Sequence, residues 1–454
     1  MSLVNKVQIY MKADSTKARA MRGSLWTILG HAISQGVRLA SNLILTRLLF
    51  PEVFGVMAIV QVVLQGLVMF SDVGLAPSIV RSKNTSDPRF LNTAWTVQLI
   101  KNSLLWLLTI GIAFPLANFY ERPELTYLIP LSGLTLLING MFPIKVILAS
   151  REMNLFKVTL GQLVGQIVGT LISVTLAFYY KSALIFVVGA VAGEAVRLAL
   201  YSIFLPGKNN RLQIYAPALR ELLSFGKWIV LSSAFGFLAQ QANVFILAKY
   251  LNANTFGIYT VALVLAMLPF TVCQILNNKV LLPLFSEMHR DGAKKSSIQK
   301  GRYVVLMGSA AAVITLMFIS PFFFQILYDE RYALAGYISL VVLFSILPEM
   351  LLMVTQNKLL VEGRSLEYAA LNTLKATLLI LLGLFWVEEH KVLGVSAAVF
   401  VAGLTTYFLT LATKGTTQII KLSYELLIAL ALASAALLCV YLYSEGLIKV
   451  MELQ

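Results

Sequence analysis

A succession of long apolar segments constrains this chain more than any other feature of its sequence. An α-helix needs about 20 mainly apolar residues to cross the hydrocarbon core of a bilayer. About thirteen segments of this kind follow one another by that measure, at 24–50, 53–80, 91–117, 125–149, 158–179, 183–205, 224–250, 255–283, 302–327, 334–360, 367–386, 391–413 and 424–443. The sequence therefore predicts an all-α integral membrane protein.

The composition agrees with that class. Of the 454 residues, 58% are hydrophobic and only 13% are charged, whereas globular chains have about 45–50% and about 25%. So few charges could not cover the surface of a soluble protein. The two cysteines, Cys273 and Cys439, lie in apolar segments, and we interpret them as small core residues rather than a disulfide or metal site.

The distribution of charge predicts the orientation. The net charge is +15, and if residues 1–23 form a cytoplasmic arm, about 25 of the 36 Lys and Arg residues lie on the cytoplasmic side. This is the asymmetry that the positive-inside rule requires, so the basic balance does not indicate nucleic-acid binding. We predict a cytoplasmic N-terminus and no nucleic-acid partner.

An internal repeat predicts the domain organisation. Residues 44–60 read ILTRLLFPEVFGVMAIV, and residues 246–262 read ILAKYLNANTFGIYTVA. Six predicted spans separate the two copies, so both have the same orientation, as in a parallel repeat. We predict two six-helix bundles that enclose a cleft, plus an extra C-terminal helix. The expected boundaries are 1–23 for the arm, 24–205 for the first bundle, 206–223 for a cytoplasmic linker, 224–413 for the second bundle and 414–454 for a loop and peripheral helix.

Polar residues in the first span share one helical face. His31, Gln35, Arg38 and Asn42 are spaced by four, three and four residues, which places them in one line along a helix. A guanidinium suits phosphate or carboxylate, so Arg38 predicts an anion site in the cleft, and an ion pair between helices is the alternative. His31 is either a titrating coupling group or a hydrogen-bonded structural histidine.

The next two spans add further polar groups. Gln61, Gln65 and Asp72 share a face of the second span, where Asp72 either pairs with a cation or serves in gating. Lys101 in the third span is a second candidate anion ligand, with snorkelling to the interface as the alternative.

Later spans contain opposite charges that can pair. Glu194 and Arg197 are spaced i, i+3 and can pair with each other, while Glu349 and Lys375 can pair across the second bundle. Predicted substrate-binding residues are Arg38, Lys101, Gln35, Asn42, Gln61, Gln65, Arg197, Gln240 and Asn243. Predicted coupling or gating residues are His31, Asp72, Glu194, Glu349 and Lys375.

Two further patterns bear on packing and on catalysis. Gly161, Gly165 and Gly169 form a small-residue ridge, which predicts a helix-packing face. The sequence has no Gly-x-Ser-x-Gly, no His-Glu-x-x-His and no phosphate loop. We therefore expect a transporter rather than an enzyme, with no cofactor or metal beyond a coupling H⁺ or Na⁺.

The first two spans resemble a known family. Gln35-Gly-Val-Arg-Leu39, the stretch from Ile44 to Gly55 and Met69-Phe-Ser-Asp-Val-Gly-Leu75 are similar to Wzx-type polysaccharide flippases, which belong to the multidrug/oligosaccharidyl-lipid/polysaccharide exporter superfamily. The resemblance implies a flippase of the bacterial inner membrane that moves polyprenyl-pyrophosphate-linked oligosaccharide units by alternating access. It also implies membrane lipid, and polysaccharide polymerase or export proteins, as candidate partners.

Two other functions remain alternatives on the sequence. A drug or organic-cation antiporter with the same fold would need acidic groups in the cleft, and a membrane polysaccharide polymerase would need a sizeable outer loop. The sequence leaves open whether 424–443 spans the membrane and on which side the C-terminus lies.

Overall fold

The computed structural model describes residues 16–71, 74–82, 84, 87–152, 155–207, 210–291, 295–413 and 422–452. Over these residues the chain is helical, with turns and no strands. It divides into two compact units, which are residues 1–49 with 63–233, and residues 50–62 with 234–454. These units are defined by which residues pack together, and packing does not show where one sequence repeat ends and the next begins. The limits 24–205 and 224–413 for the two bundles therefore stay predictions.

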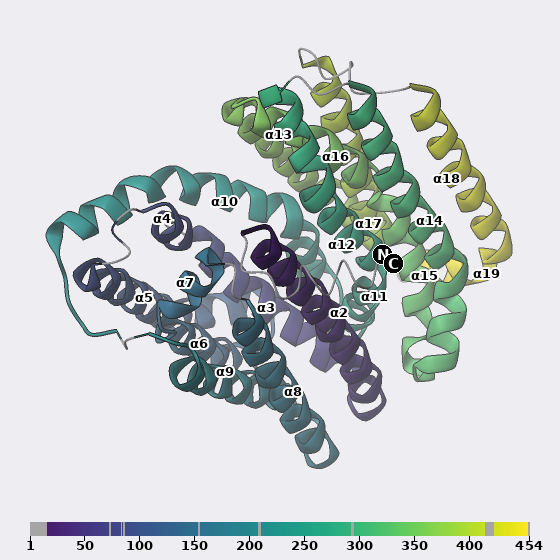
Figure 1. Cartoon of the computed structure of the whole chain (residues 1–454). Helices are drawn as coiled ribbons and strands as arrows, with labels where there is room; N and C mark the ends of the chain where they lie inside the picture. The colour runs from purple at the N-terminus through teal and green to yellow at the C-terminus, as the bar shows by residue number, and fades with distance from the viewer. Residues whose placement is uncertain are drawn as a thin grey trace, which may run out of the picture. The chain divides into compact units, whose positions relative to one another are not determined.

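Unit 1, the part formed by residues 1–49 and 63–233, holds most of the first helices (Figure 1). These are α2 (Thr16–Leu48), α4 (Leu75–Arg81), α5 (Pro88–Tyr120), α6 (Leu125–Gly140), α7 (Lys145–Arg151), α8 (Phe156–Tyr179) and α9 (Leu184–Phe204). Two further elements, α3 (Pro51–Phe70) and α10 (Ala216–Tyr250), contribute residues to both units.

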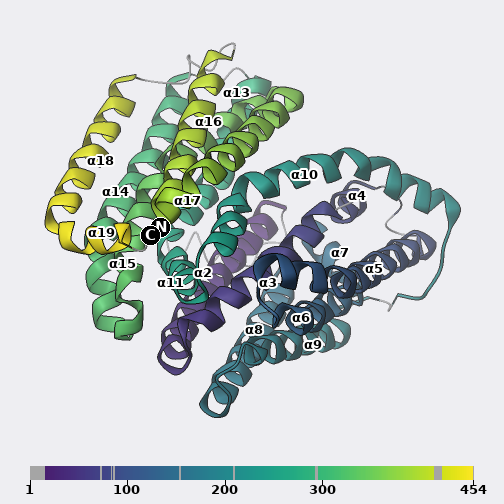
Figure 2. The same cartoon turned by 180° about the vertical axis from the view of Figure 1, so that it is seen from behind.

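Unit 2, the part formed by residues 50–62 and 234–454, holds the remaining helices (Figure 2). These are α11 (Ala253–Ala266), α12 (Leu268–Leu276), the π-helix η1 (Asn277–Leu281), α13 (Leu282–Asp291), α14 (Lys295–Leu327), the 3₁₀ turn η2 (Glu330–Tyr332), α15 (Ala333–Ser345), α16 (Leu347–Val361), α17 (Ser365–Ala412), α18 (Leu422–Leu442) and α19 (Ser444–Met451).

The helices agree with an integral membrane protein. Within the described residues, 8 helices are long and apolar enough to cross a bilayer, or up to 10 if each of two bent pairs is one span. The bent pairs are α6 with α7, at 64°, and residues 430–442 of α18 with α19, at 84°. Two further predicted spans, 24–50 and 224–250, are helical as α2 and α10 but are not among those counted.

Helix α17 contains two predicted spans. Its helical path is broken at Lys391, whose φ is 37°, a left-handed value that non-glycine residues rarely adopt. Leu379 before the break and Ala398 after it lie in one buried cluster, so the chain reverses direction at Lys391. The predicted separation into 367–386 and 391–413 is therefore confirmed.

The predicted glycine ridge of α8 is a packing face, as expected. A Cβ on Gly165 would lie 2.7 Å from the carbonyl oxygen of Gly193, and one on Gly169 would lie 2.6 Å from that of Gly189. These distances leave no room for a side chain. Glycine therefore allows the backbones of α8 and α9 to touch, and both figures show the two helices side by side (Figures 1 and 2).

The two copies of the repeat meet in unit 2. Asn254 Nδ2 donates to Glu52 Oε1 at 2.9 Å, and these residues are 202 positions apart, which is the offset of the repeat. A Cβ on Gly257 would lie 1.8 Å from the carbonyl oxygen of Pro51, and one on Gly55 would lie 3.0 Å from the backbone nitrogen of Gly257. Contact between equivalent positions is what a two-fold relation between the copies produces.

Candidate functional site

The polar face predicted on the first span lies on α2. His31 and Arg38 are exposed, and Gln35 and Asn42 are partly buried. His31 Nε2 lies 3.3 Å from Gln35 Nε2, so the first two members of the line are in contact. Arg38 stands ten residues before the end of α2 at Leu48, which is about 15 Å along a helix that rises 1.5 Å per residue. The exposed guanidinium therefore stands well within α2 rather than at its end.

A hydrogen-bonded contact with α8 lies beside this line of polar residues. Ser34 Oγ donates to Gln166 Oε1 at 2.6 Å, and Gln166 Nε2 donates back to the Ser34 carbonyl oxygen at 2.9 Å. These reciprocal bonds attach α2 to α8. Arg38 stands four residues after Ser34, so it lies on the adjoining part of the same side of α2, beside the α2–α8 contact, and its side chain is exposed there.

The other predicted uncharged ligands have mixed environments. Gln61, Gln65 and Gln240 are exposed, whereas Asn243 is partly buried and donates to the Tyr259 hydroxyl oxygen at 3.0 Å. Lys101 is partly buried on α5. Asp72 lies outside the described residues. Three glutamines on α3 and α10 are thus exposed, and Asn243 serves a contact within unit 2.

The predicted i, i+3 pair forms in α9. Arg197 Nη1 lies 2.8 Å from Glu194 Oε1, and the guanidinium carbon lies 4.8 Å from the centre of the Phe142 ring. It also lies 5.7 Å from the centre of the Tyr201 ring. A carboxylate and two aromatic rings thus already surround Arg197, so Arg38 is the more accessible cation for an incoming anion.

The predicted pair in the second bundle also forms. Lys375 Nζ on α17 lies 2.6 Å from Glu349 Oε2 on α16, and the two side chains are 6% and 16% exposed. Gly403 packs against this pair, since a Cβ there would lie 3.3 Å from Glu349 Oε1. An ion pair this enclosed compensates two charges that would be costly alone in the membrane.

The sequence did not predict a second buried network in unit 2. Arg302 of α14 pairs with Glu425 of α18, and its Nη2 donates to Thr355 Oγ1 at 2.8 Å. Tyr407 of α17 donates its hydroxyl to the same Glu425. The network ties the extra C-terminal helix α18 to three other helices.

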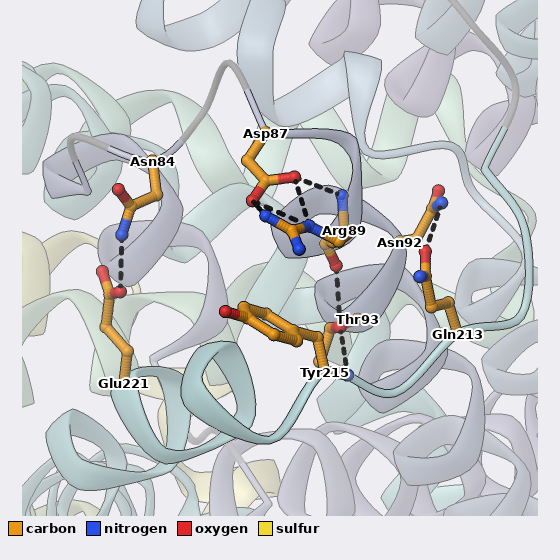
Figure 3. A network of polar contacts seen from close by, with 8 residues as sticks. All are labelled: Asn84, Asp87, Arg89, Asn92, Thr93, Gln213, Tyr215 and Glu221. Carbon is orange, nitrogen blue, oxygen red and sulfur yellow. Dashed lines mark hydrogen bonds and ion pairs between the residues drawn. The ribbon is translucent and has the colours of Figure 1, made fainter.

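The segment between the two predicted bundles lies against α5. Figure 3 shows part of this contact, with Asn92, Thr93, Gln213 and Tyr215 among the labelled side chains. The backbone N–H groups of Gln213 and Tyr215 donate to the hydroxyls of Thr96 and Thr93 at 3.0 and 2.9 Å. The backbone N–H of Arg211 donates to Asn92 Oδ1 at 3.1 Å. Alternate residues of an extended segment are therefore bonded in register, and we name residues 211–215 the linker strip.

Ion and aromatic contacts extend this attachment (Figure 3). Asp87 accepts from the backbone N–H of Arg89 at 2.8 Å and pairs with its guanidinium at 3.1 Å. These hydrogen bonds from Arg89 hold the pKa of the Asp87 carboxyl below its ordinary value. The same guanidinium lies 4.8 Å from the centre of the Tyr215 ring. Asn84 donates to Glu221 at the start of α10.

A metal site is not formed by the described part of the chain. Within it, no group of three or more His, Cys, Asp or Glu side chains is placed to hold a metal ion. Both cysteines are buried and form no disulfide. The polar groups of the described helices therefore include an exposed guanidinium, amides and three carboxylate–cation pairs.

Comparisons with known proteins agree with this architecture. Residues 44–335 match the family described as polysaccharide biosynthesis protein. Lipopolysaccharide biosynthesis protein WzxC of Escherichia coli K12 is 24% identical over 70% of this chain and 65% of its own length. Amylovoran biosynthesis protein AmsL of Erwinia amylovora is 27% identical over 57% of this chain and 68% of its own length. The chain thus spans about two thirds of these relatives.

Solved structures share the fold. The lipid II flippase MurJ, in an inward closed conformation, superposes with a TM-score of 0.69 over 93% of this chain and 99% of its own, at 10% identity. An inward-facing multidrug resistance MATE transporter of the MOP superfamily gives 0.61 over 87% of this chain and 95% of its own, at 12% identity. At such identities the likeness establishes the fold alone. The family match covers more than half of the sequence, and the chain therefore belongs to the polysaccharide biosynthesis protein family.

Proposed function

We propose that this protein is a flippase, which moves a polyprenyl-pyrophosphate-linked oligosaccharide from the cytoplasmic to the periplasmic leaflet of a bacterial inner membrane. The observation that carries the proposal is the exposed Arg38 within a line of polar side chains on α2, in a chain of the polysaccharide biosynthesis family. A guanidinium facing lipid would cost at least about 2.5–3.5 kcal/mol, so this face requires a wet or ligand-filled space.

Each of the three parts of the ligand would have its own surroundings in the protein or the bilayer. The pyrophosphate would lie against Arg38 and Lys101, because planar guanidinium and ammonium groups bind phosphate oxygens. The sugars would bind amide groups such as Gln61, Gln65 and Gln240, which are exposed. The prenyl chain would remain in lipid. Rocking of the two bundles would then open the site to each side in turn.

Transport against a gradient needs a source of free energy, and in this proposal an ion gradient supplies it. We infer that H⁺ or Na⁺ drives the exchange, with His31 and the Glu349–Lys375 pair as the groups whose charge an ion would alter. The N-terminal arm lies in the cytoplasm in this proposal, as the excess of basic residues on that side favours.

The described carboxylates favour this function over an organic-cation antiporter. Glu194 is paired with Arg197 and Glu349 with Lys375, so neither presents an unbalanced negative charge to a cationic drug. We infer a transport role without a catalytic step.

Replacing Arg38 tests the proposal. Purified full-length protein in liposomes would be given a fluorescent lipid-linked oligosaccharide, and flipping would be followed with a quencher that cannot cross the bilayer. Arg38→Ala should slow flipping about 10- to 100-fold, since hydrogen bonds to charged groups contribute about 1.5–3 kcal/mol. Arg38→Lys should retain part of the rate because the charge remains.

Ser41→Ala is the matched control, since Ser41 lies on the same helix and its hydroxyl donates to the Arg38 carbonyl oxygen at 2.9 Å. It should flip at the rate of the unmodified protein. Equal rates for Arg38→Ala and Ser41→Ala would remove Arg38 from the site. Export of organic cations without any lipid flipping would replace the proposed function by the antiporter.

A further inference from the structure

A cavity of about 1060 Å³ lies at one end of unit 1, and no residue of the α2 polar face lines it. It is bounded by the start of α5, by α7, by the start of α8, by the end of α9 and by the segment that follows α9. Its polar lining residues are Asn92, Lys145, Glu152, Lys157, Asn210 and Arg211. Three cations and one carboxylate give the lining a positive balance.

Two of the cations are fixed by the end of α9. The buried Lys145 donates from Nζ to the carbonyl oxygens of Ser202 and Leu205 at 2.9 and 3.1 Å. Lys157 donates from Nζ to the Phe204 carbonyl oxygen at 3.0 Å. These bonds balance the negative end of the helix. Lys157 is exposed, and an ammonium has three donors, so it can also bind a ligand in the cavity.

The third cation stands on an anchored wall. The backbone N–H of Arg211 donates to Asn92 Oδ1 at 3.1 Å, and the backbone N–H of Ile144 donates to Asn210 Oδ1 at 3.0 Å. These bonds attach the wall to α5 and to the start of α7. The Arg211 side chain is exposed beside them. A cation on a fixed backbone loses less conformational entropy on binding than one on a free loop.

The surface next to the cavity is apolar. Phe156 and Leu160 at the start of α8 are 41% and 47% exposed, and Ile203 and Phe204 at the end of α9 are 73% and 59% exposed. In an integral membrane protein, exposed apolar side chains on spanning helices face lipid. Lys157 is adjacent to Phe156 in the chain and bonded to Phe204. The cations therefore stand where a lipid-facing surface ends.

We propose that this cavity binds the phosphate group of a membrane lipid, with Lys157 and Arg211 as its ligands and Lys145 as a buried counter-charge. Basic pockets between membrane helices bind lipid headgroups in this way. The required ligand is an anionic phosphate ester on an apolar chain. A bilayer phospholipid and a polyprenyl phosphate both have this chemistry, and zwitterionic lipid lacks the net charge.

Native mass spectrometry of the full-length protein tests the proposal. The delipidated protein would be titrated separately with phosphatidylglycerol, phosphatidylcholine, polyprenyl phosphate and inorganic phosphate. We expect phosphatidylglycerol to bind more tightly than phosphatidylcholine. Lys157→Ala and Arg211→Ala should each weaken that binding about fivefold, the usual contribution of one basic side chain at an anionic membrane surface. High salt should reduce the difference.

Further variants separate binding from folding. Lys157→Arg should keep most of the affinity, Arg211→Glu should lose more than Arg211→Ala, and Arg220→Ala, an exposed arginine outside the cavity, should change nothing. The same pattern with polyprenyl phosphate as the tighter ligand would also support the site and would name that lipid as the source. Equal binding of both phospholipids, binding of inorganic phosphate alone, or unchanged affinity in Lys157→Ala and Arg211→Ala would overturn it.

Discussion

Individual charges in the membrane helices are balanced locally. Arg197 is placed between Glu194 and the rings of Phe142 and Tyr201, and Lys375 is bonded to Glu349. Desolvation of a lone charge is the largest cost in such an environment, and an oppositely charged partner within hydrogen-bond distance offsets it. Arg38 differs, because its side chain is exposed and stands beside the contact between α2 and α8.

The Glu349–Lys375 pair predicts a coupled response to mutation. Lys375→Met should lower the free energy of unfolding by about 3–5 kcal/mol, because it leaves a buried carboxylate without a partner. The double variant Glu349→Gln/Lys375→Met should recover most of that loss. Thermal and denaturant unfolding in detergent would measure both. Lys449→Met, at an exposed lysine, is the control, and a Lys375→Met protein as stable as that control would contradict the interpretation.

Gly257 predicts a steric effect at the contact between the repeat copies. Gly257→Ala would place its Cβ 1.8 Å from the Pro51 carbonyl oxygen, so the backbones must separate. We expect destabilisation of about 1–3 kcal/mol or more, as for overpacked cores. Gly308→Ala, at a helical glycine with nothing within 4 Å of the added Cβ, should be neutral or stabilising. Melting temperatures of both variants measure the difference, and equal values would contradict the close approach.

Among the elements, the linker strip is unusual because a non-helical segment is held to a helix by side chains. Thr93, Thr96 and Asn92 accept from three alternate backbone N–H groups of residues 211–215. Two of these acceptors are hydroxyls that also donate within α5, to the carbonyl oxygens of Arg89 and Asn92. The sequence predicts a cytoplasmic linker at 206–223. The linker strip within it is held by regular hydrogen bonds and is a part of unit 1.

The linker strip predicts a local loss of protection. Thr93→Val and Thr96→Val together remove the acceptors of two backbone N–H groups. Each lost bond should cost about 1–3 kcal/mol where the donor is left unsatisfied. Hydrogen exchange at Gln213 and Tyr215 should therefore accelerate, while the rest of α5 should change little.

Thr135→Val is the matched control for that double variant. Its hydroxyl donates to the Ser132 carbonyl oxygen within α6, so it removes a hydroxyl from a membrane helix without touching the linker strip. Acceleration of equal size in the control, or none in the double variant, would show that other contacts hold the segment.

At the scale of the whole molecule, the proposed exchange requires the two halves to occupy more than one arrangement. Spin labels at Leu171→Cys in unit 1 and Leu381→Cys in unit 2 would report it, since both positions are exposed and the two native cysteines are buried. Double electron–electron resonance should give at least two distance populations, whose ratio changes with lipid-linked oligosaccharide.

A label pair confined to one helix controls for local mobility. Leu160→Cys with Leu171→Cys, both on α8, should give one distance that the ligand does not change. A single inter-unit distance that is equally insensitive to ligand would contradict alternating access in this chain.

The sequence alone determined the class of fold, the helical segments and the contacts that depend on local spacing. Apolar length predicts membrane helices because hydrocarbon thickness fixes the number of residues. The i, i+3 spacing predicts the Glu194–Arg197 pair because helix geometry alone brings these side chains together. The glycine ridge of α8 was predictable for the same reason.

Tertiary structure decided the contacts between distant segments. Arg302 and Glu425 are 123 residues apart and stand near helix ends, where a sequence pattern cannot tell a solvated charge from a buried one. Thr93 and Tyr215, 122 residues apart, meet because the chain after α9 returns along α5. The charged cavity at the end of α9 likewise needs four separate stretches of the chain. Such sites depend on how helices pack, and packing is set by the whole set of side chains rather than by the spacing within any one segment.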